Sequence, residues 1–252
     1  MLKLFARKAN SGPSNAWVPE DSRIYAVGDI HGRLDLLEDL HDAILTDAES
    51  CAVPRKVIVY LGDYIDRGPT PEGVIDCLIN SALPGFERVH LIGNHEAFML
   101  QFLTDEGAIK SWLMNGGDST LRSYGIEPYA AHITEERPKW IRGELESRLP
   151  KAHKRFLSEL QVSHEEGDYL FVHAGVRPGI EIDDQDPYDM IWIREPFLSA
   201  KEDFGKIVVH GHTPTGKPTC RSNRIGIDTG AVFGGVLTAL VLEGEDWRFI
   251  QV

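Results

Sequence analysis

Six side chains that can bind metal follow five short apolar segments of the sequence. They comprise two aspartates, one asparagine and three histidines: Asp29, Asp63, Asn94, His31, His173 and His212. Oxygen and imidazole donors without a thiolate suit Mn, Fe or Zn and are unsuited to Cu(I). One carboxylate shared between two ions would hold them about 3.5–4 Å apart, a geometry suited to displacement at phosphorus. The donor types therefore favour metal-dependent chemistry on a phosphate ester.

Each of these positions alone also has a purely structural explanation. An Asp or Asn that follows Gly at a strand end, such as Asp29, Asp63 or Asn94, is commonly a turn residue. A His-Ala-Gly or Gly-His-Thr-Pro sequence carries little information by itself. A role in turns alone does not explain why candidate metal ligands follow five apolar segments in one chain, so we favour the metal-binding interpretation.

The apolar segments that precede the candidates predict buried strands. They span residues 24–27, 57–61, 89–92, 169–172 and 207–209. Continuous apolar character is typical of strands that are covered on both faces. Helical patterns near 34–47 and 71–81 alternate with the first three segments, which predicts an α/β fold with a largely parallel sheet. Because open α/β sheets bind ligands beyond the carboxyl ends of their strands, the candidates should meet at one edge.

We predict that the chain forms one domain, to which its remaining segments add a leader, a helical insertion and C-terminal strands. Residues 1–22 are expected to form a flexible leader before a single domain at 23–252. Residues of about 97–160 predict a helical insertion, with helices at 96–103, 109–113, 135–146 and 150–160. Residues 224–252 predict strands joined by glycine turns, and we expect them to form a second, mixed sheet.

The composition is that of an ordinary globular protein, with 42% hydrophobic and 26% charged residues. A net charge of −13 disfavours a broad surface for nucleic acid or for an anionic membrane. No apolar run approaches the roughly 20 residues that span a bilayer. The three cysteines, Cys51, Cys77 and Cys220, form no disulfide framework or zinc motif, which favours a reduced, cytoplasmic location. We therefore expect no nucleic-acid or membrane partner.

Five motifs, in this order and spacing, closely resemble one branch of a known superfamily. They are Gly28-Asp-Ile-His-Gly32, Gly62-Asp-Tyr-Ile-Asp-Arg-Gly68, Gly93-Asn-His-Glu96, His173-Ala-Gly175 and Gly211-His-Thr-Pro214. The chain resembles the phosphoprotein phosphatase branch of the calcineurin-like metallophosphoesterases, and among these the short bacterial and bacteriophage lambda type. The resemblance implies a four-layer α/β/β/α sandwich. The sequence of this chain departs from the eukaryotic catalytic subunits at residues 191–196 and 227–230, which argues against regulatory partners of the eukaryotic type.

The resemblance also implies how two divalent metal ions are held. One metal would be bound by Asp29, His31 and Asp63. The other would be bound by Asp63, Asn94, His173 and His212, so that Asp63 bridges the pair. Mn²⁺ is the expected metal, with Fe or Zn as alternatives.

The predicted reaction is attack on phosphorus by a hydroxide held between the metals, since metal binding lowers the pKa of water to about 7. The leaving oxygen then needs a proton, and His95, next to Asn94, is the candidate general acid. The family pattern implies that Asp66 orients His95. Arg67 can bind phosphate oxygens through its planar guanidinium, although a salt bridge at a helix start would also explain it.

Arg194 resembles the second phosphate-binding arginine of the lambda-type enzymes, and a surface pair with Glu195 is the simpler alternative.

These residues predict a metal-dependent phosphoric monoester hydrolase that acts on phosphoproteins at Ser or Thr, or on small phosphorylated molecules. A dinucleoside tetraphosphate hydrolase of the same superfamily is the alternative. Related symmetrical hydrolases tend to lack the Asp66-Arg67-Gly68 sequence, which favours the phosphatase. A third possibility, an inactive scaffold with this fold, is disfavoured because no expected ligand is missing.

Overall fold

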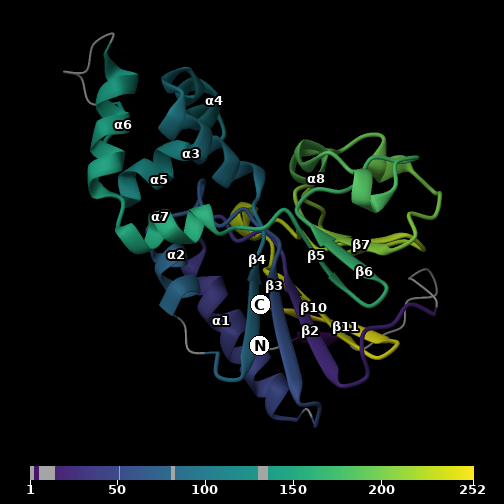
Figure 1. Ribbon diagram of the computed structural model, residues 1–252. Coiled ribbons are helices and arrows are strands. Elements are labelled where there is room, and N and C mark those ends of the chain that lie inside the picture. Colours follow the sequence, from purple (N-terminus) through teal and green to yellow (C-terminus); the bar gives the residue numbers. More distant parts are fainter. Residues whose placement is uncertain (1–2, 6–14, 51, 81–82, 130–135) are drawn as a thin grey trace.

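The computed structural model describes residues 3–5, 15–50, 52–80, 83–129 and 136–252 (Figure 1). Residues 1–2 and 6–14 of the predicted leader lie outside the described residues. In the described part of that segment, Lys3–Phe5 forms strand β1, and Ala16 and Val18 are buried. No described helix is long and apolar enough to cross a membrane.

The first sheet has six strands in the order β1-β11-β10-β2-β3-β4. Their bounds are β1 Lys3–Phe5, β2 Ser22–Val27, β3 Arg55–Tyr60, β4 Phe86–His90, β10 Thr238–Glu243 and β11 Asp246–Gln251. Strands β2, β3 and β4 are parallel, as the alternation of apolar and helical segments predicts. The pairs β2–β10, β10–β11 and β11–β1 are antiparallel.

The second sheet has five strands in the order β5-β6-β7-β9-β8. Their bounds are β5 Ser163–Glu166, β6 Tyr169–Val172, β7 Ile207–His210, β8 Thr219–Cys220 and β9 Arg224–Gly226. Strands β6, β7 and β9 are parallel, and β5 and β8 lie antiparallel at the two edges. The second sheet is therefore mixed.

The expectation that residues 224–252 form this second sheet is wrong for β10 and β11. Both strands extend the first sheet, where Leu240 of β10 lies opposite Ala26 of β2. The reason is burial on both faces. Val241 packs on the helical side of the first sheet, whereas Leu240 and Leu242 pack between the two sheets. A strand that is apolar on both faces is stable only inside a covered sheet.

Helices cover the outer faces of both sheets (Figure 1). The α-helices are α1 Leu34–Glu49, α2 Pro71–Asn80, α3 Asn94–Thr104, α4 Ile109–Met114, α5 Gly117–Ser123, α6 Arg137–Arg148, α7 Lys151–Ser158 and α8 Pro187–Trp192. Short 3₁₀ turns are η1 Glu106–Ala108, η2 Ile182–Asp184, η3 Phe197–Ser199 and η4 Ala231–Phe233. The helices expected in the insertion are present as α3, α4, α6 and α7, and α5 is an additional one. Residue 135, where one of them was expected to begin, lies outside the described residues.

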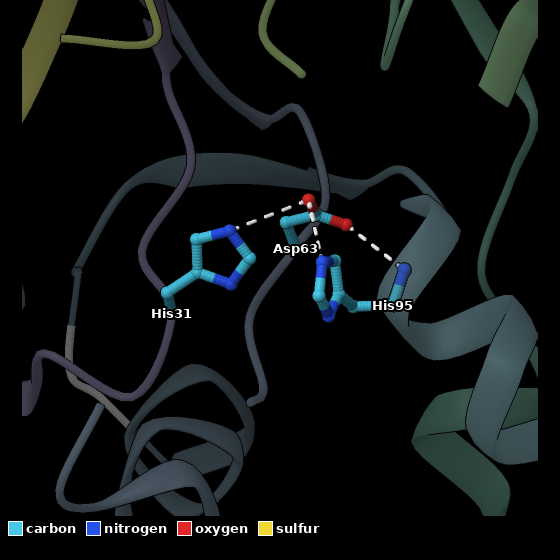
Figure 2. A group of neighbouring side chains, drawn as sticks. All are labelled: His31, Asp63 and His95. Carbon is cyan, nitrogen blue, oxygen red and sulfur yellow. Dashed lines mark hydrogen bonds and ion pairs between the residues drawn. The ribbon is translucent and has the colours of Figure 1, made fainter. Parts of the chain in front are cut away.

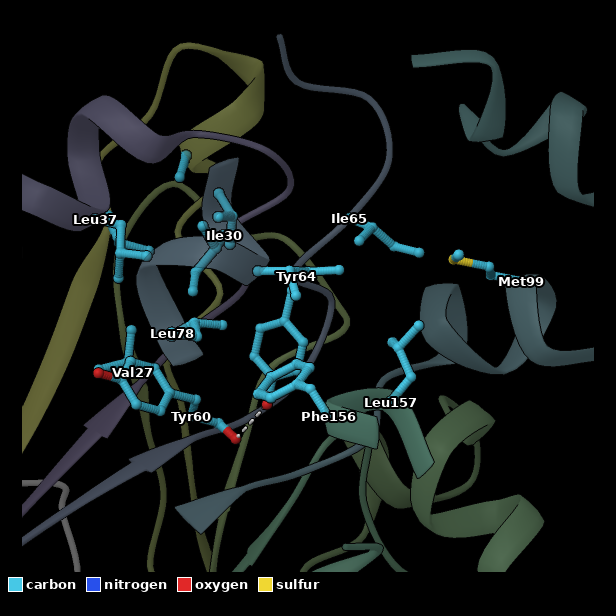
Figure 3. Close-up of a cluster of buried hydrophobic side chains, with 14 of the residues drawn as sticks. Val27, Ile30, Leu37, Tyr60, Tyr64, Ile65, Leu78, Met99, Phe156 and Leu157 are labelled. Carbon is cyan, nitrogen blue, oxygen red and sulfur yellow. Dashed lines mark hydrogen bonds between the residues drawn. The ribbon is translucent and has the colours of Figure 1, made fainter. Parts of the chain in front are cut away.

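Three apolar clusters separate the layers of the fold. The first packs α1 and α2 on the first sheet and includes Tyr60, Tyr64 and Phe156 (Figure 3). The second lies between the two sheets, where Val59 and Phe171 both belong to it. The third packs Met190 of α8 on the outer face of the second sheet. The architecture is thus helices, sheet, sheet, helices, the four-layer α/β/β/α sandwich that the motifs imply.

Candidate metal centre

The loops that follow β2, β3, β4, β6 and β7 bring their polar side chains together beyond the strand ends. Two groups of ligand atoms each lie within 4.8 Å of one another: His31, Asp63 and His95, and Asp63, His173 and His212. Figure 2 shows the first group around Asp63. The two oxygens of Asp63 face different groups, since Oδ2 lies 3.5 Å from His31 Nε2 and Oδ1 lies 3.4 Å from His173 Nε2. One buried carboxylate therefore joins two clusters of donors.

The backbone at these loops is held in unusual conformations. Five site residues have positive φ angles in the left-handed region: His31, Asp63, Asp66, Arg67 and His212. Such conformations are costly for residues other than Gly, and they cluster where function requires a fixed geometry. The neighbouring glycines allow the loops after β3 and β4 to touch. A Cβ on Gly93 would lie 2.2 Å from Asp63 Oδ1, and one on Gly62 would lie 2.5 Å from Gly93 N.

The hydrogen bonds of His31 and His173 leave one unprotonated nitrogen of each ring facing the site. His31 Nδ1 donates to the carbonyl of Ile65 at 2.9 Å, and His173 Nδ1 donates to that of Leu61 at 2.9 Å. Burial lowers the pKa of His31 to about 3 and also lowers the pKa of His173, so both rings are neutral near pH 7. A backbone partner of this kind is typical of metal-ligating histidines.

The acceptors that converge on the second group suit a cation. His173 Nε2 lies 3.0 Å from Asn94 Oδ1 as well as 3.4 Å from Asp63 Oδ1. In the neutral tautomer with Nδ1 protonated, this nitrogen has no hydrogen to donate to either oxygen. Three lone-pair atoms thus face one another, which is unfavourable unless a cation lies among them. The residues therefore fit a divalent metal with nitrogen and oxygen ligands.

Asn94 and Asp29 both lie beside His212, although only Asn94 is predicted to share a metal with that histidine. Asn94 Oδ1 is 2.8 Å from His212 Nδ1, and Asp29 accepts a hydrogen bond from the His212 backbone N–H at 3.1 Å. Burial, with the neighbouring Asp228 and Asp63 carboxylates, raises the pKa of Asp29 well above its usual value. Excess negative charge of this kind favours binding of a cation. Asp228, which the sequence analysis does not assign to the site, is a further buried acid beside Asp29.

His95 is held by a buried network that comes from the helical insertion. Its Nδ1 lies 2.7 Å from Asp66 Oδ2, and Asp66 also accepts hydrogen bonds from Trp112 Nε1 and Thr120 Oγ1. Burial alone would lower the pKa of His95, but the Asp63 and Asp66 carboxylates outweigh it and raise that pKa. The His95 Nε2 atom is buried without a hydrogen-bond partner and lies 3.9 Å from Asp63 Oδ2. This nitrogen can therefore present a proton to a group bound next to Asp63.

The two predicted phosphate-binding arginines lie at different sides of the centre. Arg67 Nη1 is 2.6 Å from His31 Nε2, and its guanidinium lies 5.5 Å from the ring centroid of the exposed Phe233. The cation of Arg67 thus contacts the same lone pair that would ligate a metal. Arg194 is exposed and close enough to lower the pKa of His173 and His212, which burial already lowers. Glu195, its suggested surface partner, accepts a hydrogen bond from Ser199 instead.

A family model for calcineurin-like phosphoesterases matches residues 22–233, which contain every residue of this centre. The chain belongs to this family. It is therefore a hydrolase that acts on phosphate esters, and the family depends on metal. The two donor groups around Asp63 could bind that metal.

Individual relatives of the chain carry two kinds of name. Serine/threonine-protein phosphatase 1 of Salmonella typhimurium is 28% identical over 223 residues, covering 85% of this chain and 89% of that protein. A bis(5'-nucleosyl)-tetraphosphatase (asymmetrical) of Bacillus thuringiensis is 29% identical over 230 residues, covering 85% and 88%. The solved cold-active protein-tyrosine phosphatase of a Shewanella species has a TM-score of 0.55 and 16% identity, with 92% and 80% covered. That last likeness supports the fold.

Glu96 is a positioning residue of this phosphoesterase to which the sequence analysis assigns no role. It is fully buried, and its carboxylate accepts hydrogen bonds from the backbone N–H groups of Asp63, Tyr64 and Gly93 at 2.8–2.9 Å. Glu96 is also the third residue of α3, and by accepting from the backbone N–H of Gly93, the N-cap residue, it supplies the glutamate half of a capping box. That spacing after a predicted strand end is the sequence signal that could have identified it. The side chain fixes the loop that carries Asp63.

Replacing Glu96 with Gln should lower the free energy of unfolding by about 1–3 kcal/mol, because the amide NH₂ would face backbone donors and leave one of them unsatisfied. Urea unfolding monitored by circular dichroism measures the change. Glu38→Gln is the matched control, since Glu38 is exposed on α1 and should change stability by less than about 0.5 kcal/mol. Equal stability of the two variants would contradict the role given to Glu96.

Proposed function

We propose that this phosphoesterase is a binuclear metal-dependent phosphatase whose main substrates are proteins phosphorylated on Ser or Thr. Asp29, His31 and Asp63 would hold one ion, and Asp63, Asn94, His173 and His212 the other. Mn²⁺ is the proposed metal, with Fe or Zn as alternatives. When bound, the ions would supply an activated water and positive charge for the phosphoryl oxygens.

The observation that carries the choice of substrate is the His95–Asp66 pair. Departure of a serine or threonine alkoxide demands a proton at the leaving oxygen, whereas departure of a nucleotide phosphate from a tetraphosphate demands it much less. His95 has the features of such an acid: a raised pKa, an Asp66 partner at 2.7 Å and an unpartnered Nε2. A buried and oriented general acid is best used on a poor leaving group.

The two arginines are proposed to bind the phosphate. Arg67 would leave its contact with His31 Nε2 and turn its guanidinium to the phosphoryl oxygens, which a planar donor fork fits. Arg194 would contribute from the opposite side of the centre, and its exposure leaves it accessible to substrate.

Cys77 and Cys220 are free thiols, which supports the proposed cytoplasmic location.

A dinucleoside tetraphosphate hydrolase is the second candidate. It is favoured by the Bacillus relatives that carry that name and match 85% of this chain. Both candidates use the same centre, so only the substrate separates them.

A substrate panel with added Mn²⁺ tests the choice. It compares phosphoserine, phosphothreonine and phosphotyrosine peptides with p-nitrophenyl phosphate and diadenosine tetraphosphate. We expect kcat/KM for the phosphoserine or phosphothreonine peptides to equal or exceed that for the dinucleotide. A preference of about 100-fold or more for the dinucleotide, or some 2.7 kcal/mol in transition-state binding, would instead establish the second candidate.

A further inference from the structure

A row of aromatic rings leads from His95 to the surface. The ring of His95 contacts that of Phe98 with centroids 6.3 Å apart, and Phe98 contacts Trp192 edge-on at 4.8 Å. Trp192 stacks on Tyr188 at 5.9 Å, and Tyr188 is 63% exposed. Phe98 belongs to α3 and the other two rings to α8, so the row joins helices that lie on two sides of the strand ends (Figure 1). Neither the packing of the core nor the proposed chemistry accounts for Tyr188 and Trp192.

The position of the row matches the leaving-group side of the substrate. A general acid must face the oxygen that departs, so the peptide bearing that oxygen lies on the side of His95. The two ring-to-ring steps, 6.3 Å and 4.8 Å, correspond to about three residues of extended chain at ~3.3–3.6 Å each. A side chain two or three residues from the phosphoserine could therefore reach Trp192 and Tyr188.

The segment directly before α8 is strongly acidic. Glu181, Asp183, Asp184 and Asp186 are all exposed. In the described part of the chain, no ion pair joins Glu181, Asp183 or Asp184 to a basic side chain. This uncompensated charge attracts Lys and Arg and repels a polyanion such as a dinucleoside tetraphosphate. The charge thus favours a basic peptide beside the rings.

From the rings and the charge together we infer that Phe98, Trp192, Tyr188 and the acidic segment 181–186 bind the peptide that flanks the phosphorylated residue. They select basic phosphopeptides with an aromatic residue two or three positions from the phosphoserine. This inference rests on the proposed phosphoprotein substrate and adds its sequence preference. Trp192 is the main specificity-determining residue, because it contacts both other rings.

Phosphoserine peptides that differ at one position test the preference. With Trp instead of Ala two or three residues from the phosphoserine, kcat/KM for the wild type should rise about 3- to 10-fold, which corresponds to the 0.5–1.5 kcal/mol of an aromatic pair. Trp192→Ala should bring this ratio close to one, and Trp192→Phe should restore part of it. Tyr188→Ala, at an exposed position, provides a second variant that should reduce the ratio. Trp140→Ala on α6 is the control and should keep the wild-type ratio.

Charge is tested in the same peptides with Lys or Glu near the phosphoserine. The wild type should prefer Lys about 10-fold at low salt, and both high salt and the Asp183→Asn/Asp184→Asn variant should reduce that preference.

Phosphopeptide turnover with no preference for Trp or Lys would overturn this inference and leave the proposed function intact. An equal loss of diadenosine tetraphosphate turnover in Trp192→Ala would also overturn it, because the rings would then bind a base. Turnover of the dinucleotide without any turnover of phosphopeptides would overturn the proposed function itself.

Discussion

Replacing Asp63 with Asn should lower kcat/KM for p-nitrophenyl phosphate by at least about 10³-fold, because one carboxylate serves both groups of donors. Its two oxygens face His31 and His173 at 3.5 Å and 3.4 Å. Burial alone would raise the pKa of Asp63, but the positive charge of His173, His95 and His31 in their protonated forms holds that pKa well below its usual range, and His95 keeps this charge to the highest pH. The side chain is therefore charged at neutral pH. Asparagine keeps its shape and removes the charge that both ions need.

The matched variants separate a bridging role from a general loss of charge. Asp29→Asn should weaken mainly one metal, because Asp29 is a proposed ligand only of the ion held with His31 and Asp63, whereas Asp63 is a proposed ligand of both. Asp39→Asn, at an exposed position on α1, should keep wild-type activity. Steady-state assays over a range of Mn²⁺ concentrations measure all three. Activity of Asp63→Asn that high Mn²⁺ restores to the wild-type level would contradict a carboxylate shared by both ions.

His95→Asn should reduce kcat by roughly 10²- to 10⁴-fold for an alkyl phosphate with little change in KM, because the acid acts only as the leaving oxygen departs. The loss should be smaller for p-nitrophenyl phosphate, whose leaving group hardly needs a proton. In the wild type, the raised pKa of His95 keeps the acid protonated to higher pH, so loss of its proton should give kcat an alkaline limb above that pKa. That alkaline limb should be absent from the variant.

Two controls distinguish the acid from a ligand or a structural residue. His95 lies in one of the donor groups, so its replacement would remove metal if it were a ligand. We expect the metal content of His95→Asn to equal that of the wild type. His153→Asn removes another buried histidine, one that contacts Tyr124 and Asp76, and should leave the leaving-group dependence unchanged. Equal losses on the alkyl and the p-nitrophenyl ester would show that His95 is not the acid.

The parallel strands and the loops at their ends could be predicted from local sequence. Apolar segments such as 57–61 and 207–209 are continuous because both faces are covered, and the polar residue after each one marks the strand end. Since parallel strands place their carboxyl ends at the same edge, Asp63 and His212 could be expected to meet.

The parts that could not be predicted depend on contacts between distant residues. Trp112 and Thr120 bind Asp66 across separations of 46 and 54 residues, and no local pattern relates them. Helix α5 and the turn at Gly116 place that network, where the carbonyl of Gly116 accepts a hydrogen bond from the Arg67 backbone. The sequence also could not show which sheet β10 joins, because an apolar strand can pack in either sheet. Only its antiparallel pairing with β2 places it in the first sheet.

If Asp63 joins two metal sites, the purified protein must hold two ions, and its metal content can be measured. Protein stripped with a chelator, reloaded with Mn²⁺ and freed of excess metal should contain two ions per chain by elemental analysis, and Asp63→Asn should retain fewer than one. Activity should disappear on stripping and return with the metal. One ion per chain in the fully active wild type, full activity in excess chelator, or two ions in Asp63→Asn would show that Asp63 does not bridge two metals.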